Sequence, residues 1–263
     1  MNSLGIGDER SQVLKAVSDQ ILEVWSSFDS PRDSEPEIST DLYSWFSTKL
    51  PHAPTDVTEV IREAFEIMDA STAQSRPRFF AYIGSSGLEI GAIADFIAST
   101  YDVNQAIDAR AASLMDEQTI RWISEFIGYP HQQGVFTSGG MVSNLTALAA
   151  ARTHALPDSR KVGISKPVAI YSSQESHYSN TRAVEVLGMG SRSIRAIEID
   201  EAHRMKPQLL RAQIQRDLNE GVVPIAIIAT AGTTLTGAID PIDEIADIAH
   251  EFGIWLHVDG AYG

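Results

Sequence analysis

The sequence of 263 residues contains no cysteine, which excludes a disulfide framework and any metal site built on thiolates. A chain without cysteine fits a reducing compartment, so we predict a cytoplasmic protein. No apolar run is long enough to cross a membrane, and residues 1–20 are polar where a signal peptide would be apolar. We therefore expect no membrane partner.

Basic residues are also scarce. Twenty Lys and Arg face 35 Asp and Glu, which gives a formal net charge of −15, and no basic run occurs anywhere. Because nucleic-acid binding depends on clustered Lys and Arg that contact phosphates, we expect no nucleic-acid partner. The 43% of hydrophobic residues suit a globular core, and the length allows one large domain with a small appendage.

Residues 1–75 are predicted to form an N-terminal helical segment. Apolar residues recur at helical spacing over 8–25, 41–50 and 55–71, and a proline-containing connection spans 26–40. These amphipathic helices are too loosely connected to form much of a core alone. We expect their apolar faces to pack against the main domain or a second subunit, and the second case predicts a homodimer for the full-length protein.

Residues 76–263 are predicted to form a large α/β domain. After a turn-rich segment and two long helical patterns (88–101 and 108–127), short strands alternate with helices. The expected strands lie near 134–137, 167–172, 193–197, 223–230 and 254–258, and the expected helices near 141–154, 178–187, 206–219 and 242–251. Such alternation favours a mostly parallel sheet flanked by helices on both faces.

Four of the expected strands are followed by small or polar residues, namely Gly139 with Gly140, His177, Thr234 and Asp259. In open α/β sheets, ligands bind outside the carboxyl ends of the strands. The four strand ends therefore predict one pocket.

Each signal has a purely structural alternative. Gly139 and Gly140 at a helix start allow a phosphate to approach free N–H groups, but they also suit a tight strand-to-helix turn. The pattern matches neither a Walker loop nor the dinucleotide-binding glycine motif. His177 could cap the next helix, and Thr234 could belong only to a turn.

Asp259 is compatible with three kinds of site: a nucleotide hydrolase, a metal site shared with His257, or a partner for a heterocyclic nitrogen. The hydrolase alternative lacks a phosphate loop, and the metal alternative lacks a third ligand nearby. Pyridoxal phosphate is a cofactor that needs these groups together: an anion site at a helix end, a flat partner for its ring and a carboxylate at its pyridine nitrogen.

The same residues carry a family resemblance. The runs concerned are Thr137-Ser-Gly-Gly with Asn144, then His177, then Ala229-Thr-Ala-Gly-Thr-Thr234 with Asp240-Pro, and His257-Val-Asp-Gly-Ala-Tyr-Gly263. In this order they resemble the pyridoxal-phosphate-dependent group II amino acid decarboxylases, which include aromatic-L-amino-acid and glutamate decarboxylases. The match covers about 76–263. It implies a fold-type I transferase-like domain that removes the α-carboxylate of an L-amino acid as CO2.

The resemblance also implies roles for individual residues. His177 would stack on the cofactor ring, and Asp259 would pair with the pyridine nitrogen, which makes these two the expected catalytic residues. The other expected contacts are Gly139, Gly140 and Met141 to the phosphate, Thr234 to the ring-substituent side, Ala261 to the ring face opposite His177, and Phe80 and Tyr82 to the substrate.

Several positions depart from the family pattern. Met141 stands where the family usually has Ser, so only its backbone N–H remains for the phosphate. Arg76 replaces a His, Gly260 replaces an Ala, and residues 113–116 differ from the usual acidic motif. These differences leave the substrate amino acid open.

In the family, a lysine downstream of the aspartate binds the cofactor covalently. The five lysines present match no such position: Lys15, Lys49, Lys161, Lys166 and Lys206. We therefore expect a fragment that lacks the C-terminal part, or a split product whose partner chain carries it, and we expect this chain to be inactive alone. An aldehyde synthase, a carbon–carbon lyase and a non-catalytic remnant of the family are the alternatives.

Overall fold

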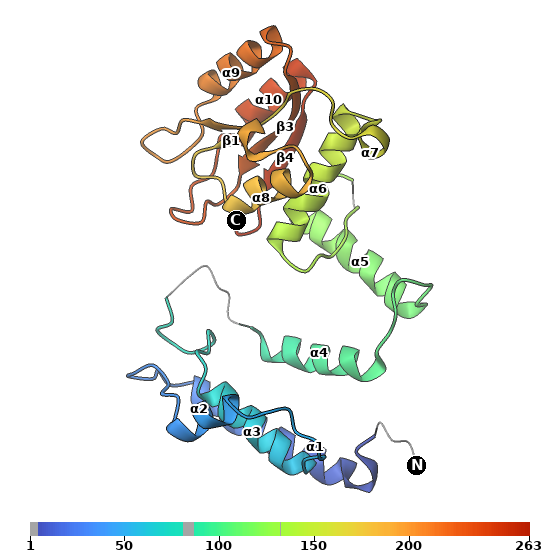
Figure 1. Cartoon of the computed structure of the whole chain (residues 1–263), viewed down its shortest axis with the longest axis vertical. Coiled ribbons are helices and arrows are strands. Elements are labelled where there is room, and N and C mark those ends of the chain that lie inside the picture. Colours follow the sequence, from blue (N-terminus) through green and yellow to red (C-terminus); the bar gives the residue numbers. More distant parts are fainter. Residues whose placement is uncertain (1–4, 81–86, 132) are drawn as a thin grey trace. The chain divides into compact units, whose positions relative to one another are not determined.

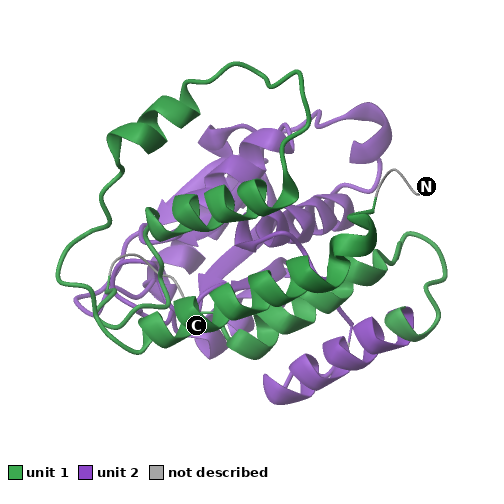
Figure 2. Ribbon diagram, turned by 90° about the horizontal axis from the view of Figure 1, so that it is seen from below, with its two compact units in different colours: residues 1–112 green, residues 113–263 purple. Residues whose placement is uncertain are grey.

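The computed structural model describes residues 5–80, 87–131 and 133–263. The chain forms two compact units, residues 1–112 and 113–263 (Figures 1 and 2). The domain boundary predicted after residue 75 falls inside the first unit and stays a prediction.

The first unit is helical, as the apolar spacing predicts. Its elements are a 3-10 turn η1 (Gly7–Glu9) and the helices α1 (Arg10–Phe28), α2 (Thr40–Phe46), α3 (Val57–Asp69) and α4 (Glu89–Tyr101). Ser39 caps α2 by accepting a hydrogen bond from the N–H of Leu42, and Asp56 caps α3 by accepting one from Thr58.

Helix α2 ends at Phe46, four residues before the predicted end. The hydroxyls of Ser47 and Thr48 donate to the carbonyls of Tyr43 and Trp45, and such bonds compete with continued helix. Pro51 also disfavours the helical conformation at the residue before it.

Apolar side chains of the first unit are mostly exposed. Among its described residues, only Val13 and Leu42 are buried hydrophobics. A cavity of about 360 Å³ lies between α1 and α4, and its lining includes Val17, Trp25 and Phe96. The helices of this unit thus lack an extensive core of their own.

The second unit alternates helices and strands. Its elements are α5 (Ala111–Phe126), α6 (Gly140–Ala155), α7 (Ser159–Val162), β1 (Val168–Ser173), α8 (Tyr178–Val186), η2 (Ser191–Ser193), β2 (Ile194–Ile197), α9 (Pro207–Asn219), β3 (Val223–Thr230), α10 (Ile242–Phe252) and β4 (Trp255–Asp259). The first two residues of α5 belong to the first unit.

The four strands form one parallel sheet in the order β2-β1-β3-β4, which confirms the predicted α/β class. Leu148 of α6 and Val184 of α8 pack with Ile228 on one face of the sheet. Leu210 of α9 and Ile245 of α10 are buried in the cluster on the other face. Helices therefore cover both faces, which explains the nearly continuous apolar sequences of β1 and β3.

The strand predicted near 134–137 is wrong. Residues 133–137 form no ladder with any described residue, and Val135 and Phe136 are 70% and 54% exposed. An extended segment becomes a strand only when a neighbour satisfies its backbone hydrogen bonds. A cavity of about 1030 Å³ is lined by this segment, by α5 and by β4.

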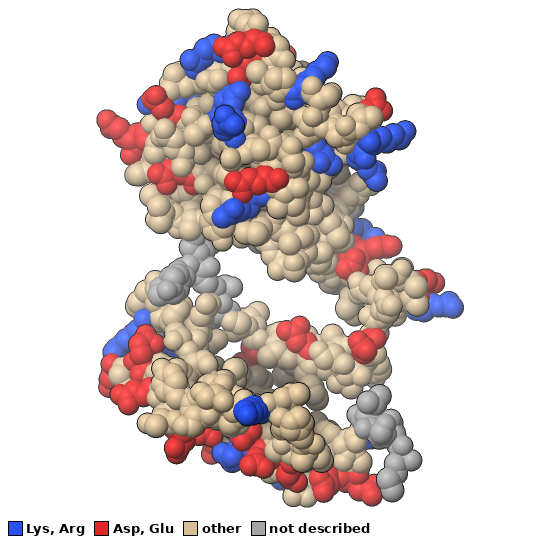
Figure 3. All heavy atoms as spheres, viewed as in Figure 1, with Lys and Arg blue, Asp and Glu red and all other residues tan. Residues whose placement is uncertain are grey.

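Charged side chains lie mainly at the surface. On the face of the second unit drawn in Figure 3, Lys and Arg side chains are interspersed with acidic ones. Within the described ranges, no helix is both long and apolar enough to span a membrane.

Candidate functional site

The carboxyl ends of β1, β3 and β4 lie at the same edge of the sheet, because the strands are parallel. His177 follows β1 by four residues, the turn with Thr234 follows β3, and Asp259 is the last residue of β4. Thr230, the last residue of β3, is the register partner of Asp259. The fold thus brings three of the four predicted strand ends together.

The fourth predicted element, the glycine turn, opens α6. Gly139 is the N-cap residue with φ +148°, a conformation that favours glycine. A Cβ on Gly140 would come within 3.0 Å of the Cβ of Ala261, so the turn lies directly against the segment after β4. The first N–H groups of a helix have no intrahelical acceptor, so this end of α6 is suited to bind an anion.

His177 is the N-cap residue of α8. Its Nδ1 accepts a hydrogen bond from the backbone N–H of Ser179 at 3.2 Å and lies 2.7 Å from the Ser179 hydroxyl. The prediction that His177 could cap the next helix is therefore confirmed. The cap also fixes the ring in place at the end of β1, which is compatible with a stacking role.

Asp259 is 6% exposed and is surrounded by donors. Its Oδ2 accepts hydrogen bonds from Nδ2 of Asn144 at 2.9 Å and Nδ2 of Asn180 at 3.1 Å. Its Oδ1 accepts one from the N–H of Ala261 at 3.3 Å. An oriented, buried carboxylate at a strand end is what a protonated heterocyclic nitrogen would require.

Asn144 and Asn180 were not assigned a role from the sequence. Both are buried helical residues that contact Asp259. Asn144 lies in the motif that carries the family resemblance, but the motif alone did not indicate this contact. A polar residue near a helix start is the available sequence signal, and it does not distinguish a buried asparagine from an exposed one.

His257 also contacts this network, since its Nε2 lies 2.8 Å from Oδ1 of Asn144. Burial lowers the pKa of His257, while the charge of Asp259 acts in the opposite direction. Within residues 5–80, 87–131 and 133–263, no three His, Asp or Glu side chains gather as a metal site. The contact of His257 is thus to an amide.

The turn after β3 is held by Thr233 and not by Thr234. The buried Thr233 hydroxyl accepts a hydrogen bond from the N–H of Ala238 at 3.1 Å and lies 2.7 Å from the hydroxyl of Thr236. Thr234 is exposed at the surface of the same turn. Its contact with a cofactor stays a prediction.

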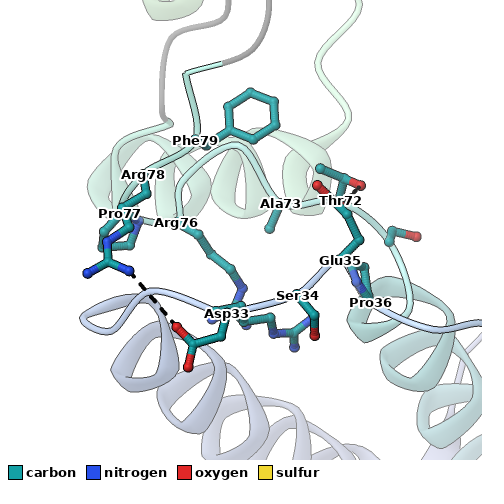
Figure 4. Close-up of a pocket in the computed structure, with 12 residues that line it drawn as sticks. Asp33, Ser34, Glu35, Pro36, Thr72, Ala73, Arg76, Pro77, Arg78 and Phe79 are labelled. Atoms are coloured by element: carbon teal, nitrogen blue, oxygen red, sulfur yellow. Dashed lines mark hydrogen bonds and ion pairs between the residues drawn. The ribbon is translucent and has the colours of Figure 1, made fainter.

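The predicted substrate residues belong to the first unit. Phe80 is 90% exposed, and Tyr82 lies outside the described residues. The preceding residues line a pocket of about 310 Å³, where Arg78 pairs with Asp33 at 3.9 Å (Figure 4). The Arg76 guanidinium donates to the carbonyl of Ser27 at 2.9 Å. Burial is the larger cause that lowers the pKa of Arg76, and the positive charge of Arg32 is the second.

Comparison with known proteins identifies the family. The family model described as pyridoxal-dependent decarboxylase conserved domain matches residues 40–263. Cysteine sulfinic acid decarboxylase of Rattus norvegicus is 36% identical over 214 residues, which cover 78% of this chain and 42% of the relative. Aromatic-L-amino-acid decarboxylase of Bacillus atrophaeus is 32% identical over 260 residues, which cover 97% of this chain and 53% of the relative.

Solved structures give the same result. The crystal structure of mouse CSAD matches with a TM-score of 0.89 and 29% identity, and the match covers 98% of this chain and 56% of that chain. The chain thus spans about half the length of these relatives.

Proposed function

The chain belongs to the pyridoxal-dependent decarboxylase family, and from this premise we propose that its second unit binds pyridoxal 5'-phosphate for the decarboxylation of an L-amino acid. The complete enzyme would release the α-carboxylate as CO2 and leave the amine. The observation that carries the proposal is the buried carboxylate of Asp259 at the edge where Gly140 meets Ala261.

The residues present fit the cofactor. When bound, pyridoxal phosphate supplies an electron sink for the bond that breaks at the substrate Cα. Asp259 would accept a hydrogen bond from the ring nitrogen and keep that nitrogen protonated. The backbone N–H groups of Gly140 and Met141 would bind the phosphate, His177 would lie against one face of the ring, and Ala261 would lie against the other.

The covalent lysine and the rest of the sheet are proposed to lie in polypeptide outside these 263 residues, either downstream or in a separate chain. Two features support this. The match covers about half of each relative, and β4 pairs with β3 on one edge while its other edge has no strand partner among the described residues. The cavity beside β4 is large enough for added backbone, and Phe136, Leu256 and Val258 give it an apolar lining. Unpaired strand edges commonly accept a further strand.

A homodimer of the full-length protein is also part of the proposal. Its support is the exposed apolar surface of the helices in the first unit, where Leu22, Phe46 and Phe96 are 58%, 56% and 61% exposed. Sedimentation of a full-length form at micromolar concentration tests it, and a monomer there would contradict it. A cytosolic location remains a prediction from the cysteine-free sequence.

The relatives do not identify the substrate of this protein, because one is named for a sulfinic amino acid and another for aromatic amino acids. An aldehyde synthase or carbon–carbon lyase would use the same cofactor site. Product analysis of a full-length form separates these activities, since only the decarboxylase gives the amine and CO2 as its products.

Cofactor titration of the 263-residue chain tests the proposed function. We expect added pyridoxal phosphate to bind reversibly, with a change in visible absorbance that Asp259→Asn weakens. Borohydride reduction followed by mass spectrometry should leave no stoichiometric adduct on Lys161, Lys166 or Lys206, and no CO2 should form. Absence of any binding would support a non-catalytic remnant, and a stoichiometric adduct with CO2 release would overturn the proposed location of the lysine.

A further inference from the structure

Asn144 uses every hydrogen-bonding group of its side chain inside the site. Its Nδ2 donates to Oδ2 of Asp259 and to the hydroxyl of Ser179, both at 2.9 Å. Its Oδ1 lies 2.8 Å from Nε2 of His257. The residue is 3% exposed, so these three protein groups replace water around the amide.

The chemistry of the neighbours fixes the orientation of this amide. The atom facing the Asp259 carboxylate must be a donor, so it is the amide nitrogen, and the carbonyl oxygen then faces His257. Because a carbonyl oxygen only accepts, Nε2 of His257 must carry the hydrogen. An amide rotated by 180° would bring its oxygen against the carboxylate.

The two oxygens of Asp259 are consequently not equivalent. Oδ2 receives two amide hydrogens, from Asn144 and Asn180. Oδ1 has one longer contact, with the backbone N–H of Ala261 at 3.3 Å. Oδ1 is therefore the oxygen with acceptor capacity to spare.

We propose that Asn144 is a positioning residue. His257, as the Nε2–H tautomer, fixes the orientation of the Asn144 amide, and the amide directs Oδ1 of Asp259 toward the ring nitrogen of the cofactor. The identity of that ring rests on the proposed function. The tautomer of His257 and the orientation of the amide do not.

Asn180 provides a matched control within the same site. It is 1% exposed, and its Nδ2 donates to the same Oδ2 of Asp259. Its backbone N–H donates to the carbonyl of His177, but its side chain bonds to neither His177 nor His257, and its Oδ1 is buried without a partner in the described chain. Replacing either asparagine by alanine removes one donor from Asp259 and creates a similar space. Only the loss of Asn144 removes the acceptor of His257.

The first experiment is nitrogen NMR of the ring of His257 in the whole chain, labelled with 15N-histidine and free of cofactor. The seven histidines are distinguished by single substitution, with His257→Gln identifying the signal. We expect the Nε2–H tautomer in the wild-type chain, a mixture of tautomers in Asn144→Ala, and the wild-type pattern in Asn180→Ala. An Nδ1–H tautomer in the wild-type chain would overturn the inference without any variant, even if Asn144→Ala fails to fold. An equal change in both variants would overturn it as well.

The second experiment measures the dissociation constant of pyridoxal phosphate by absorbance. We expect Asn144→Ala to weaken binding about tenfold, which corresponds to the loss of one hydrogen bond to a charged group, and Asn180→Ala to weaken it less. Equal weakening would contradict the special role of Asn144. If the wild-type chain binds no cofactor, the proposed function fails. The tautomer measurement alone then decides whether His257 fixes the orientation of the Asn144 amide.

Discussion

Asn144 and Asp259 lie 115 residues apart in the sequence, and the amide of the first donates a hydrogen bond of 2.9 Å to the carboxylate of the second. Helix α6 packs on the sheet so that its first turns reach the end of β4. This contact joins the helix that begins at the glycine turn to the carboxylate at the end of β4.

His257 should make the stability of the second unit depend on pH. Burial lowers the pKa of His257 in the folded state, so the unfolded chain binds the proton more readily. Its contribution is therefore complete above the unfolded pKa of about 6.5 and is lost as the pH falls toward the lower folded value. We expect a slope of at most about 1.4 kcal/mol per pH unit from this group.

Urea unfolding at pH 5.5, 6.5 and 7.5 measures this effect. His257→Gln should flatten the pH dependence below 6.5, because Gln cannot titrate and can still donate to Asn144. His52→Gln, in an exposed loop of the first unit, controls for the loss of one histidine. An unchanged slope in His257→Gln would show that another group controls the stability in this range.

Substitution of His177 should separate its two structural features, the cap and the flat ring. His177→Asn keeps an acceptor for the N–H of Ser179, and Asn is a favourable N-cap residue. His177→Phe keeps a flat ring and loses the acceptor, so we expect it to lower the free energy of unfolding by about 1 kcal/mol.

The binding of pyridoxal phosphate should respond in the opposite order. If His177 stacks on the ring, Phe retains more affinity than Asn, as measured by absorbance titration. Equal affinity in the two variants would remove the stacking role and leave His177 as a helix cap.

Gly140→Ala should destabilise the second unit. The added Cβ would meet that of Ala261 at 3.0 Å, so α6 or the segment after β4 must shift, and overpacking of this kind costs about 1 kcal/mol or more. Gly260→Ala is the matched control, because its Cβ would lie 3.5 Å from the nearest atom, an ordinary contact. Thermal unfolding of both variants measures the difference, and an equal effect would show that the approach of Gly140 to Ala261 is not tight in solution.

Asp217 holds a buried ion pair away from the site. It is 2% exposed, and both its oxygens lie 3.1 Å from Nε of Arg195. Asp217→Ala leaves the partly buried guanidinium of Arg195 without its partner, and we expect a loss of about 3 kcal/mol in urea unfolding. Glu66→Ala removes an exposed pair with Arg62 and should change the stability by about 0.5 kcal/mol or less. Similar losses in the two variants would show that burial does not distinguish the pairs.

The sequence was sufficient to predict the elements that depend on local pattern. The apolar runs of β1, β3 and β4 and the helices between them follow from periodicity and appear near their expected bounds. Because parallel strands end at one edge, the proximity of His177 and Asp259 also follows from the order of elements.

Features that depend on a neighbour could not be predicted in this way. Residues 134–137 have the composition of a strand, but strand formation requires a partner that the described chain does not provide. The contact between Asn144 and Asp259 depends on how α6 packs against β4, and no local pattern encodes it. A buried asparagine and a solvated one look alike until the packing is known.

The contacts of Asn144 have a consequence for the alignment of the outermost strand. His257 and Asp259 are two residues apart on β4, so both side chains point to the same face, and a slip of β4 by two residues would preserve which side chains face α6. Such a slip would, however, move one of the two out of reach of Asn144 or bring the carboxylate against the amide carbonyl, where two acceptors would repel each other. The hydrogen bonds of the Asn144 amide thus favour the native pairing of β4 with β3 over pairings slipped by two residues.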